Sequence, residues 1–313
     1  MLAPICLFTY NRPAETKLTI QALQENLLAP LSELIIFSDG PKNQMAISRV
    51  TEVRRYLKTV KGFKSITIIE SSVNKGLANS IIEGVSEIIE KHEKVIVLED
   101  DLIASCNFLD FMNQSLDFYN ENKEIKSVNG YSLSIKRNVN SVYFQTRPFP
   151  WGWATWKDRW NTEIFNKEEI RKTINSDSSI LKGFKKTCGD DISRMLLNSI
   201  TNKNDSWYVR WTFDHFRNNK FSAFPKYSFI QNIGHTSDGT HCKGINSYET
   251  KLIDEKITEF TFSEFTLPGK KQKKEFLKYF SIRHKIWIRI KLLRTSKGRK
   301  ELIEDIKIKI RLK

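Results

Sequence analysis

The stretch Val95-Ile96-Val97-Leu98-Glu99-Asp100-Asp101 places three consecutive acids at the end of a short apolar run. Four aliphatic residues in a row are typical of a strand that is buried on both faces of a parallel sheet. Open α/β sheets bind ligands outside the carboxyl ends of their strands, so we expect the acids there. Neighbouring carboxylates repel one another unless a cation compensates them, and hard divalent ions prefer oxygen ligands. The stretch therefore indicates a metal site or, alternatively, the acidic first turn of a helix.

Strand-like and helix-like segments alternate along the chain up to this stretch. The expected strands before it are residues 4–10, 34–37 and 66–69, and the expected helices are residues 14–28, residues 48–57 and a helix that opens within 74–79 and ends near 90. Four alternations over about 100 residues predict an α/β fold, with a mostly parallel wound sheet and helices on both faces.

Polar residues follow three of the expected strands. Asn11 and Arg12 follow the first, Ser38-Asp39-Gly40 follow the second, and Glu99 to Asp101 follow the fourth. Because parallel strands end at the same edge of a sheet, these residues should lie together. The edge is expected to form a crevice of the size of a nucleotide.

The second half of the chain is rich in indoles. The segment 147–160 reads Arg-Pro-Phe-Pro-Trp-Gly-Trp-Ala-Thr-Trp-Lys-Asp-Arg-Trp. Indole faces suit the flat apolar faces of sugars or bases, although packing in a core is the commoner fate of Trp. We expect Trp151 and Trp153 to line a site, and Trp156 and Trp160 to be structural.

The positive charge of the protein belongs to its C-terminal segment. The formal net charge is +15, but residues 270–313 alone hold 17 Lys and Arg against 4 Asp and Glu. The preceding residues carry 34 basic and 32 acidic side chains, so they are nearly neutral. This distribution argues against a nucleic-acid-binding body.

The basic segment also carries apolar residues at helical spacing. Phe276, Phe280, Trp287, Ile290 and Leu293 fall near one face of an expected helix. Such a basic amphipathic tail predicts binding to an anionic membrane surface through residues 270–313. A helix docked on the body is the alternative, and nucleic-acid binding is the least favoured reading.

Composition and the chain start bear on the cellular location. Forty per cent of the residues are apolar, which is ample for a core, and the four cysteines are scattered, which fits a reducing compartment. We find no signal-peptide pattern at the start and no run long enough to span a bilayer. The expected location is cytoplasmic, peripheral to the inner face of the cell membrane.

Taken together, these motifs resemble those of the GT-A nucleotide-sugar glycosyltransferases, particularly the bacterial family-2-like proteins and N-acetylglucosaminyltransferase I. The matching segments are Phe8-Thr9-Tyr10-Asn11-Arg12-Pro13, Ser38-Asp39-Gly40, Asn74-Lys75-Gly76-Leu77-Ala78, Leu98-Glu99-Asp100-Asp101, Pro150-Trp151-Gly152-Trp153, Asp205-Ser206-Trp207 and Asn232-Ile233-Gly234-His235. They occur in the expected order between residues 4 and 242. The resemblance implies a GT-A type fold.

The resemblance also implies roles for residues of a donor site. Arg12 and Asp39 would meet the nucleotide, with Asp39 accepting a hydrogen bond from the base, and Thr9 would lie on the ribose side. Asp101 would coordinate Mn²⁺ or Mg²⁺ at the diphosphate. The further donor-binding residues implied are Lys75, Glu99, Asp100, Trp151 and Trp153, and His235 or His241 would be a second metal ligand if a loop closes.

Transfer to an acceptor hydroxyl needs a base to take its proton. In the inverting relatives an acid beside the Trp-rich half has this role, and Asp205 matches best. Asp214 is a competitor, and Asp190 and Asp191 are more distant candidates, because an acid pair after Gly189 is also typical of a solvated helix start.

These expectations combine into one functional prediction. The chain is expected to be a metal-dependent, inverting hexosyl- or N-acetylhexosaminyltransferase that uses a nucleotide sugar, most plausibly a UDP-sugar. The acceptor would be a cell-surface polysaccharide, such as capsule or lipopolysaccharide, or a lipid-linked oligosaccharide. Residues 1–125 would bind the donor, 126–265 would bind the acceptor and carry catalysis, and 266–313 would form the tail.

Two other functions remain open at this point. A sugar nucleotidyltransferase shares a wound sheet and an acidic metal site, although no early Gly-rich phosphate loop is present. A catalytically idle carbohydrate-binding or scaffold protein could keep the same fold.

Overall fold

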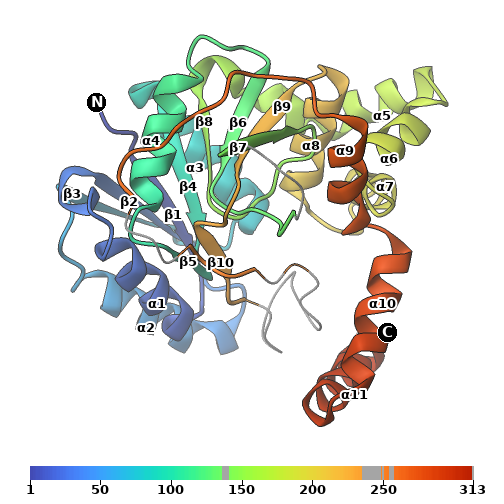
Figure 1. The fold of residues 1–313 in the computed structure, drawn as a ribbon. Coiled ribbons are helices and arrows are strands. Elements are labelled where there is room, and N and C mark those ends of the chain that lie inside the picture. Colours follow the sequence, from blue (N-terminus) through green and yellow to red (C-terminus); the bar gives the residue numbers. More distant parts are fainter. Residues whose placement is uncertain (136–140, 235–247, 249, 254–256, 312–313) are drawn as a thin grey trace.

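The protein is built around a single eight-stranded sheet with helices on both faces (Figure 1). The computed structural model describes residues 1–135, 141–234, 248, 250–253 and 257–311. The strand order is β3-β2-β1-β4-β8-β6-β9-β7, and β5 and β10 form a separate two-stranded sheet. Most neighbouring strands run parallel, so the predicted α/β fold with a mostly parallel wound sheet is confirmed.

The strands are β1 (Ile5–Thr9), β2 (Glu33–Ser38), β3 (Ser65–Glu70), β4 (Lys94–Glu99), β5 (Leu102–Ala104), β6 (Ile125–Asn129), β7 (Val142–Gln145), β8 (Trp153–Trp156), β9 (Phe221–Pro225) and β10 (Ile230–Asn232). The helices are α1 (Pro13–Gln24), α2 (Ile47–Leu57), α3 (Leu77–His92), α4 (Phe108–Phe118), α5 (Lys167–Ser176), α6 (Ile180–Cys188), α7 (Ile192–Ile200), α8 (Trp207–Arg217), α9 (Lys270–Lys278), α10 (Ile282–Leu293) and α11 (Ser296–Arg311).

The order of the first four strands creates the crevice. From β1 the chain proceeds outward to β2 and β3, and then returns to place β4 on the other side of β1. The chain leaves β1 through α1 toward β2 and leaves β4 into β5, which belongs to the separate two-stranded sheet, so a gap opens at the carboxyl ends of β1 and β4. Residues 9–12 and 99–101 lie at this switch point.

Two hydrophobic cores cover the two faces of the sheet. Along β1, Ile5 and Leu7 belong to one core, whereas Cys6 and Phe8 belong to the other. Such alternation is the side-chain period of a strand. Helices α1, α2 and α4 pack in the first core, and α3, α6, α7 and α8 pack in the second.

The indoles of the second half are mostly structural. Trp153 on β8 is fully buried, with its ring centroid 4.5 Å from that of Trp211 and 5.6 Å from that of Trp160. The prediction that Trp153 lines a site is therefore wrong, because β8 pairs with both β4 and β6 and points this indole into the core beneath α8. Trp156 and Trp160 are buried, as expected.

The basic C-terminal segment divides into a docked part and a projecting part. Phe276 and Phe280 are each 1% exposed and belong to the first core, whereas α10 and α11 form a helical hairpin that extends away from the body (Figure 1). The hydroxyl of Ser281 caps α10, which breaks the single amphipathic helix that we expected. Trp287, Ile290 and Leu293 lie on the projecting part and are exposed.

Helix α9, which lies within the segment expected to form the tail, contributes Phe276 to the first core. In the part of the chain that the structure describes, no helix combines the length and the apolar character that crossing a bilayer requires.

Candidate functional site

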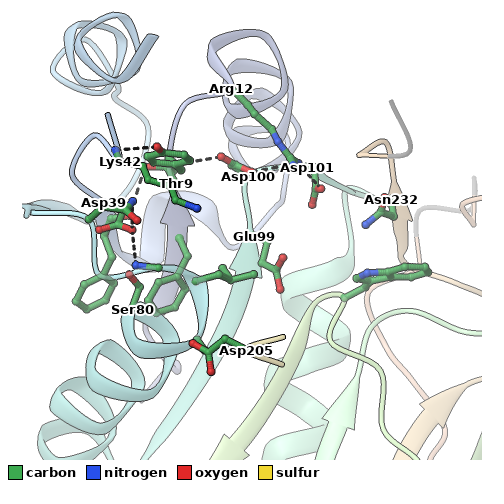
Figure 2. Close-up of a pocket in the computed structure, with 18 residues that line it drawn as sticks. Thr9, Arg12, Asp39, Lys42, Ser80, Glu99, Asp100, Asp101, Asp205 and Asn232 are labelled. Atoms are coloured by element: carbon green, nitrogen blue, oxygen red, sulfur yellow. Dashed lines mark hydrogen bonds and ion pairs between the residues drawn. The ribbon is translucent and has the colours of Figure 1, made fainter. Parts of the chain in front are cut away.

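A cavity of about 310 Å³ lies at the switch point of the sheet (Figure 2). Its walls come from the ends of β1, β2 and β4 and from the start of α3. The lining residues are Phe8, Thr9, Tyr10, Arg12, Phe37, Asp39, Lys42, Asn74, Gly76, Leu77, Ala78, Ser80, Glu99, Asp100, Asp101, Trp151, Asp205 and Asn232. We refer to it as the first cavity.

The acidic triplet is held at one side of this cavity. The Arg12 guanidinium donates to Asp101 Oδ2 at 2.6 Å and lies 3.8 Å from Asp100 Oδ1. The backbone N–H of Tyr10 donates to Asp100 Oδ2 at 3.1 Å. The strand β5 follows the triplet directly, so these acids do not begin a helix. Instead, the exits of β1 and β4 are tied together through the carboxylates.

Asp101 has one oxygen left over for a ligand. Within the described residues, its Oδ1 is buried and has no hydrogen-bond partner. The segment after β10 passes close to the same carboxylate, because a Cβ on Gly234 would lie 1.9 Å from Asp101 Oδ2. Only glycine fits there, and the Ile233 N–H donates to the Asp101 carbonyl at 2.9 Å.

This arrangement fits a divalent cation that also binds a diphosphate. Among the described side chains, no group of three or more His, Cys, Asp and Glu is placed to hold a metal. Mg²⁺ and similar ions need only one or two protein carboxylates when phosphate and water oxygens complete the shell. The orphaned Asp101 Oδ1 is such a ligand, and His235 lies outside the described residues.

Burial and mutual repulsion disfavour the fully ionised form of the triplet. Burial raises the pKa of Glu99 well above its usual range, and the neighbouring Asp101 and Asp100 raise it further. Burial and Asp101 likewise raise the pKa of Asp100, while Arg12 and the Tyr10 N–H oppose the shift. A bound cation would relieve this repulsion.

Asp39 lines the cavity, but its carboxylate is already saturated. Oδ1 accepts from the N–H groups of Gly40 at 2.9 Å and Lys75 at 2.8 Å. Oδ2 accepts from Asn74 Nδ2 at 2.9 Å and from the Gly76 N–H at 3.0 Å. Four donors fill the acceptor positions of a carboxylate. The hydrogen bond expected from a base would require one of these to be given up.

Two further predicted residues are not part of the cavity. The Lys75 ammonium donates to Glu83 at 2.7 Å on the exposed side of α3, so only its backbone reaches Asp39. Asp214 lines neither this cavity nor the second cavity described below, and its buried ion pair with Lys126 speaks against its predicted role as the base. The Lys126 ammonium compensates the negative charge of Asp214, which lies at a buried position of α8.

A second cavity of about 380 Å³ adjoins the first. The two share Leu77, Glu99, Trp151 and Asp205. The remaining walls of the second cavity come from residues 147–150, from α7 and the start of α8, and from Tyr248 and Phe280. The two cavities thus adjoin at a shared wall that includes the carboxylates of Glu99 and Asp205.

Asp205 stands at this shared boundary. Its side chain is half exposed, and Oδ1 accepts from Arg210 Nη2 at 3.1 Å and lies 3.4 Å from the Lys167 ammonium. In Figure 2, Glu99 lies between Asp101 and Asp205. Asp190, by contrast, lies on the surface beside Lys185, and Asp191 accepts two hydrogen bonds from Arg147.

Several lining residues escaped the sequence analysis. Tyr10, Asn74 and Asn232 lie inside the quoted motifs, so their position next to the named residues was a usable signal. Lys42 and Ser80 gave no signal, because each is a polar residue near the start of a loop or helix and such residues are common on surfaces. In the second cavity, Tyr248 and Phe280 come from segments far away in sequence.

Comparison with solved structures finds limited similarity. The chain is similar to a mannosyltransferase from Pyrobaculum calidifontis solved in complex with GDP-Man and Mn²⁺, with 9% identity, a TM-score of 0.36, and coverage of 50% of this chain and 46% of that one. It is also similar to S. aureus TarS, with 10% identity, a TM-score of 0.42, and coverage of 74% and 36%. A structure of TarS residues 1–349 gives 11% identity, a TM-score of 0.34, and coverage of 54% and 50%.

The chain thus spans half or less of the length of each of these proteins. No family model and no curated protein matches the sequence. Similarity of this extent assigns neither a family nor an activity.

Proposed function

We propose that this protein is a glycosyltransferase that moves a sugar from a nucleotide-diphosphate sugar to an acceptor hydroxyl. The observation that carries the proposal is the pair of adjoining cavities, which meet at Glu99 and Asp205. A transfer between two substrates needs two binding spaces that join at the reacting atoms. The first cavity lies at a switch point, where nucleotides bind in open α/β sheets.

The chemistry of the first cavity suits a diphosphate leaving group. Negative charge builds up on the departing diphosphate as the bond to the anomeric carbon breaks. Arg12, which follows the carboxyl end of β1, supplies a fixed positive charge beside Asp100 and Asp101. Asp101 Oδ1 would hold Mn²⁺ or Mg²⁺, which acts as a Lewis acid on phosphate oxygens when bound.

Asp205 is the proposed base for the acceptor hydroxyl. Its carboxylate lines both cavities, so a hydroxyl bound in the second cavity can reach it beside a sugar bound in the first. The proton would pass to Asp205 as the acceptor oxygen attacks the anomeric carbon, while the diphosphate departs from the opposite side. Such a single displacement inverts the anomeric configuration.

The proposal extends to donor, acceptor and location. Following the resemblance of the motifs, we take a UDP-sugar as the donor to test first, with a hexose or N-acetylhexosamine as the transferred unit. A lipid-linked oligosaccharide or cell-surface polysaccharide is the proposed acceptor. The exposed apolar residues of α10 and its many cations support a location on the cytoplasmic face of a membrane.

The first test is calorimetric titration of nucleotides and nucleotide sugars into the full chain, with and without Mn²⁺ or Mg²⁺. We expect metal-dependent binding of one nucleoside diphosphate, and its loss in Asp101→Asn, since the amide is a poorer metal ligand. Asp117→Asn, an exposed acid on α4 paired with Lys94, is the matched control and should bind as the native chain does.

The outcomes separate the alternatives. Absence of nucleotide binding under every metal condition would leave a carbohydrate-binding or scaffold protein. Release of pyrophosphate rather than nucleoside diphosphate during turnover would identify a nucleotidyltransferase.

A further inference from the structure

We propose that the second cavity is the acceptor subsite and that it takes a neutral pyranose unit, held against an aromatic wall that Phe280, in the turn between α9 and α10, completes. The inference rests on the proposed function, and it adds the chemical class of the acceptor and the residues that recognise it.

The wall consists of four aromatic rings in mutual contact. The centroid of Trp151 lies 5.5 Å from that of Phe149 and 6.0 Å from that of Tyr248. The centroid of Phe280 lies 5.8 Å from those of Tyr248 and Phe149. Pyranose rings expose a flat face of C–H groups, which packs well on an aromatic surface.

The two outer rings of the wall have different roles. Tyr248 is partly exposed, so its ring can contact a ligand in the cavity. Phe280 is 1% exposed and therefore acts as a positioning residue that supports Tyr248. The acceptor affinity should depend on both, but only Tyr248 would touch the sugar.

The ring of Phe280 packs against Arg147 and Gly189, which come from other parts of the chain. The Arg147 guanidinium lies 3.7 Å from the centroid of the Phe280 ring, which is within the range of a cation–π contact. A Cβ on Gly189 would lie 2.7 Å from Phe280 Cβ and 3.0 Å from Arg147 Nη1, and Gly189 also has φ +117°. Glycine is therefore required at position 189 for Phe280 to pack against this loop.

The charges of the cavity favour a neutral ligand. Of the described residues that line it, Arg147 is the single cation, and its guanidinium donates to Asp191 at 2.7 and 3.1 Å and to the Cys188 carbonyl at 2.8 Å. Glu99 and Asp205 add negative charge at the boundary. A phosphate or uronate group in this cavity would meet carboxylates rather than a free cation.

The position of the second cavity indicates the direction in which a longer acceptor would extend from the reacting hydroxyl. Its boundary with the first cavity holds Asp205, where the reacting hydroxyl must lie, whereas Phe280 lines the second cavity alone. Helix α10 begins two residues after Phe280. An acceptor that extends past the aromatic wall therefore leads toward the projecting hairpin.

The test uses saturation-transfer NMR on the full chain with UDP and Mg²⁺ present. The probes are the methyl pyranosides of glucose, galactose, mannose, N-acetylglucosamine and N-acetylgalactosamine, together with methyl glucuronide and glucose 6-phosphate. We expect saturation of the ring protons of at least one neutral probe and weaker or no transfer to the two anions. Tyr248→Ala should weaken binding of that probe about three- to tenfold, the equivalent of one aromatic stacking contact, and Tyr248→Phe should not.

A pair of matched variants isolates the role of Phe280. Phe276→Leu in α9 and Phe280→Leu just after it make the same change at residues of equal burial, but only Phe280 lines the cavity. We expect weaker pyranoside binding in Phe280→Leu alone, with calorimetric nucleotide binding and thermal stability similar in both variants.

The remaining outcomes overturn one proposal or the other. Equal pyranoside binding in all four variants, or preferred binding of an anion, would contradict the inference while leaving the proposed function in place. Pyranoside binding that depends on Tyr248 without any nucleotide binding would support a sugar site in the second cavity and contradict the glycosyltransferase. If the full chain bound neither a pyranoside nor a nucleotide, both the inference and the proposed function would be contradicted.

Discussion

At the scale of single residues, the carboxylates of the two cavities differ because their surroundings differ. Glu99 is buried among acids, so its pKa is raised, whereas Asp205 is half exposed and lies beside Arg210 and Lys167. A base must be ionised before it can accept a proton. Glu99 is therefore poorly suited to this role, whereas Asp205 stands at the same boundary beside two cations.

Replacing this base should slow the transfer step itself. We expect Asp205→Asn to lower kcat roughly 10²- to 10⁴-fold, because general-base catalysis contributes about that much. Nucleotide binding should be unchanged, since the amide keeps the size of the side chain. Steady-state kinetics with a released-diphosphate assay measures the effect. Asp190→Asn, on the exposed neighbour of Asp191, is the control, and equal activity of the two variants would rule out Asp205 as the base.

Asp39 offers a test between two roles for one carboxylate. If its function is to hold residues 74–76 against the end of β2, Asp39→Asn leaves backbone N–H groups facing an amide N–H₂. The free energy of unfolding should then fall by about 1–3 kcal/mol, as for unsatisfied buried donors. Urea denaturation measures this loss. An unchanged stability with weakened uridine binding would instead favour base recognition.

Residue roles were only partly predictable from the sequence. The triplet, Arg12, Trp151 and Asp205 line the cavities, as expected from motifs that follow strand ends. The saturation of Asp39 could not be foreseen, because its four donors depend on how residues 74–76 fold back. The choice between Asp205 and Asp214 needed the helix phase of α8, which turns Asp214 toward Lys126.

At the scale of elements, β6, α8 and β9 are joined by a buried histidine. The Nδ1–H of His215 donates to the Trp211 carbonyl at 2.9 Å, so Nε2 is the acceptor facing Ser127 Oγ at 3.2 Å and Ser222 Oγ at 3.4 Å. Burial and, to a smaller extent, the nearby Lys126 lower the pKa of His215 to about 3. The cluster therefore requires the neutral imidazole.

This histidine should make stability fall on acidification. Below pH 6.5 the unfolded chain binds a proton at this position that the folded chain does not take up until about pH 3. Between pH 6.5 and 5 the loss attributable to His215 should be about 2 kcal/mol. Urea titrations at both pH values, on the native chain and on His215→Gln, measure it. The same pH dependence in both proteins would contradict the assignment.

Elements were more predictable from the sequence near the start of the chain. The strand and helix pattern up to β4 followed from local apolar runs and turn residues, because these mark each element within its own segment of sequence. The insertion of β8 between β4 and β6 depends on pairing between distant segments, which no local pattern encodes. For the same reason Trp153 was assigned to a site rather than to the core.

At the scale of the whole molecule, the body and the projecting hairpin should be separable. Helix α10 presents Ile282, Ile286, Trp287, Ile290 and Leu293 to solvent, and residues 282–313 hold 12 Lys and Arg against 3 Asp and Glu. This combination suits the interface of an anionic bilayer. The body, by contrast, keeps Phe276 and Phe280 in its core.

Truncation after Ser281 should therefore abolish membrane binding and preserve the body. We expect the full chain, but not the truncated one, to sediment with vesicles containing phosphatidylglycerol, and we expect this binding to weaken as salt is raised. Both proteins should bind nucleotide equally. Truncation after Pro268 is the contrasting variant and should lower the melting temperature, because it uncovers Phe149 and Phe224. Vesicle binding by the protein that ends at Ser281 would contradict the role of the hairpin.

The two parts of the tail could not be distinguished from composition alone. Phe276 and Trp287 belong to one continuous apolar pattern in the sequence, and the difference in their burial arises from the Ser281 cap and from the seat that Gly189 provides. Charge distribution along the chain, in contrast, was fully visible in the sequence.

The packing of Phe280 into the wall of the second cavity has a consequence for folding during protein synthesis. Strands β1 to β4 can pair as soon as the first 100 residues have left the ribosome, since domains begin to fold from the N-terminus. The aromatic wall of the second cavity must wait for residue 280, and α10 emerges directly afterwards. A nascent chain would therefore complete its second cavity only at about the moment when it also gains the hairpin that we propose to bind a membrane.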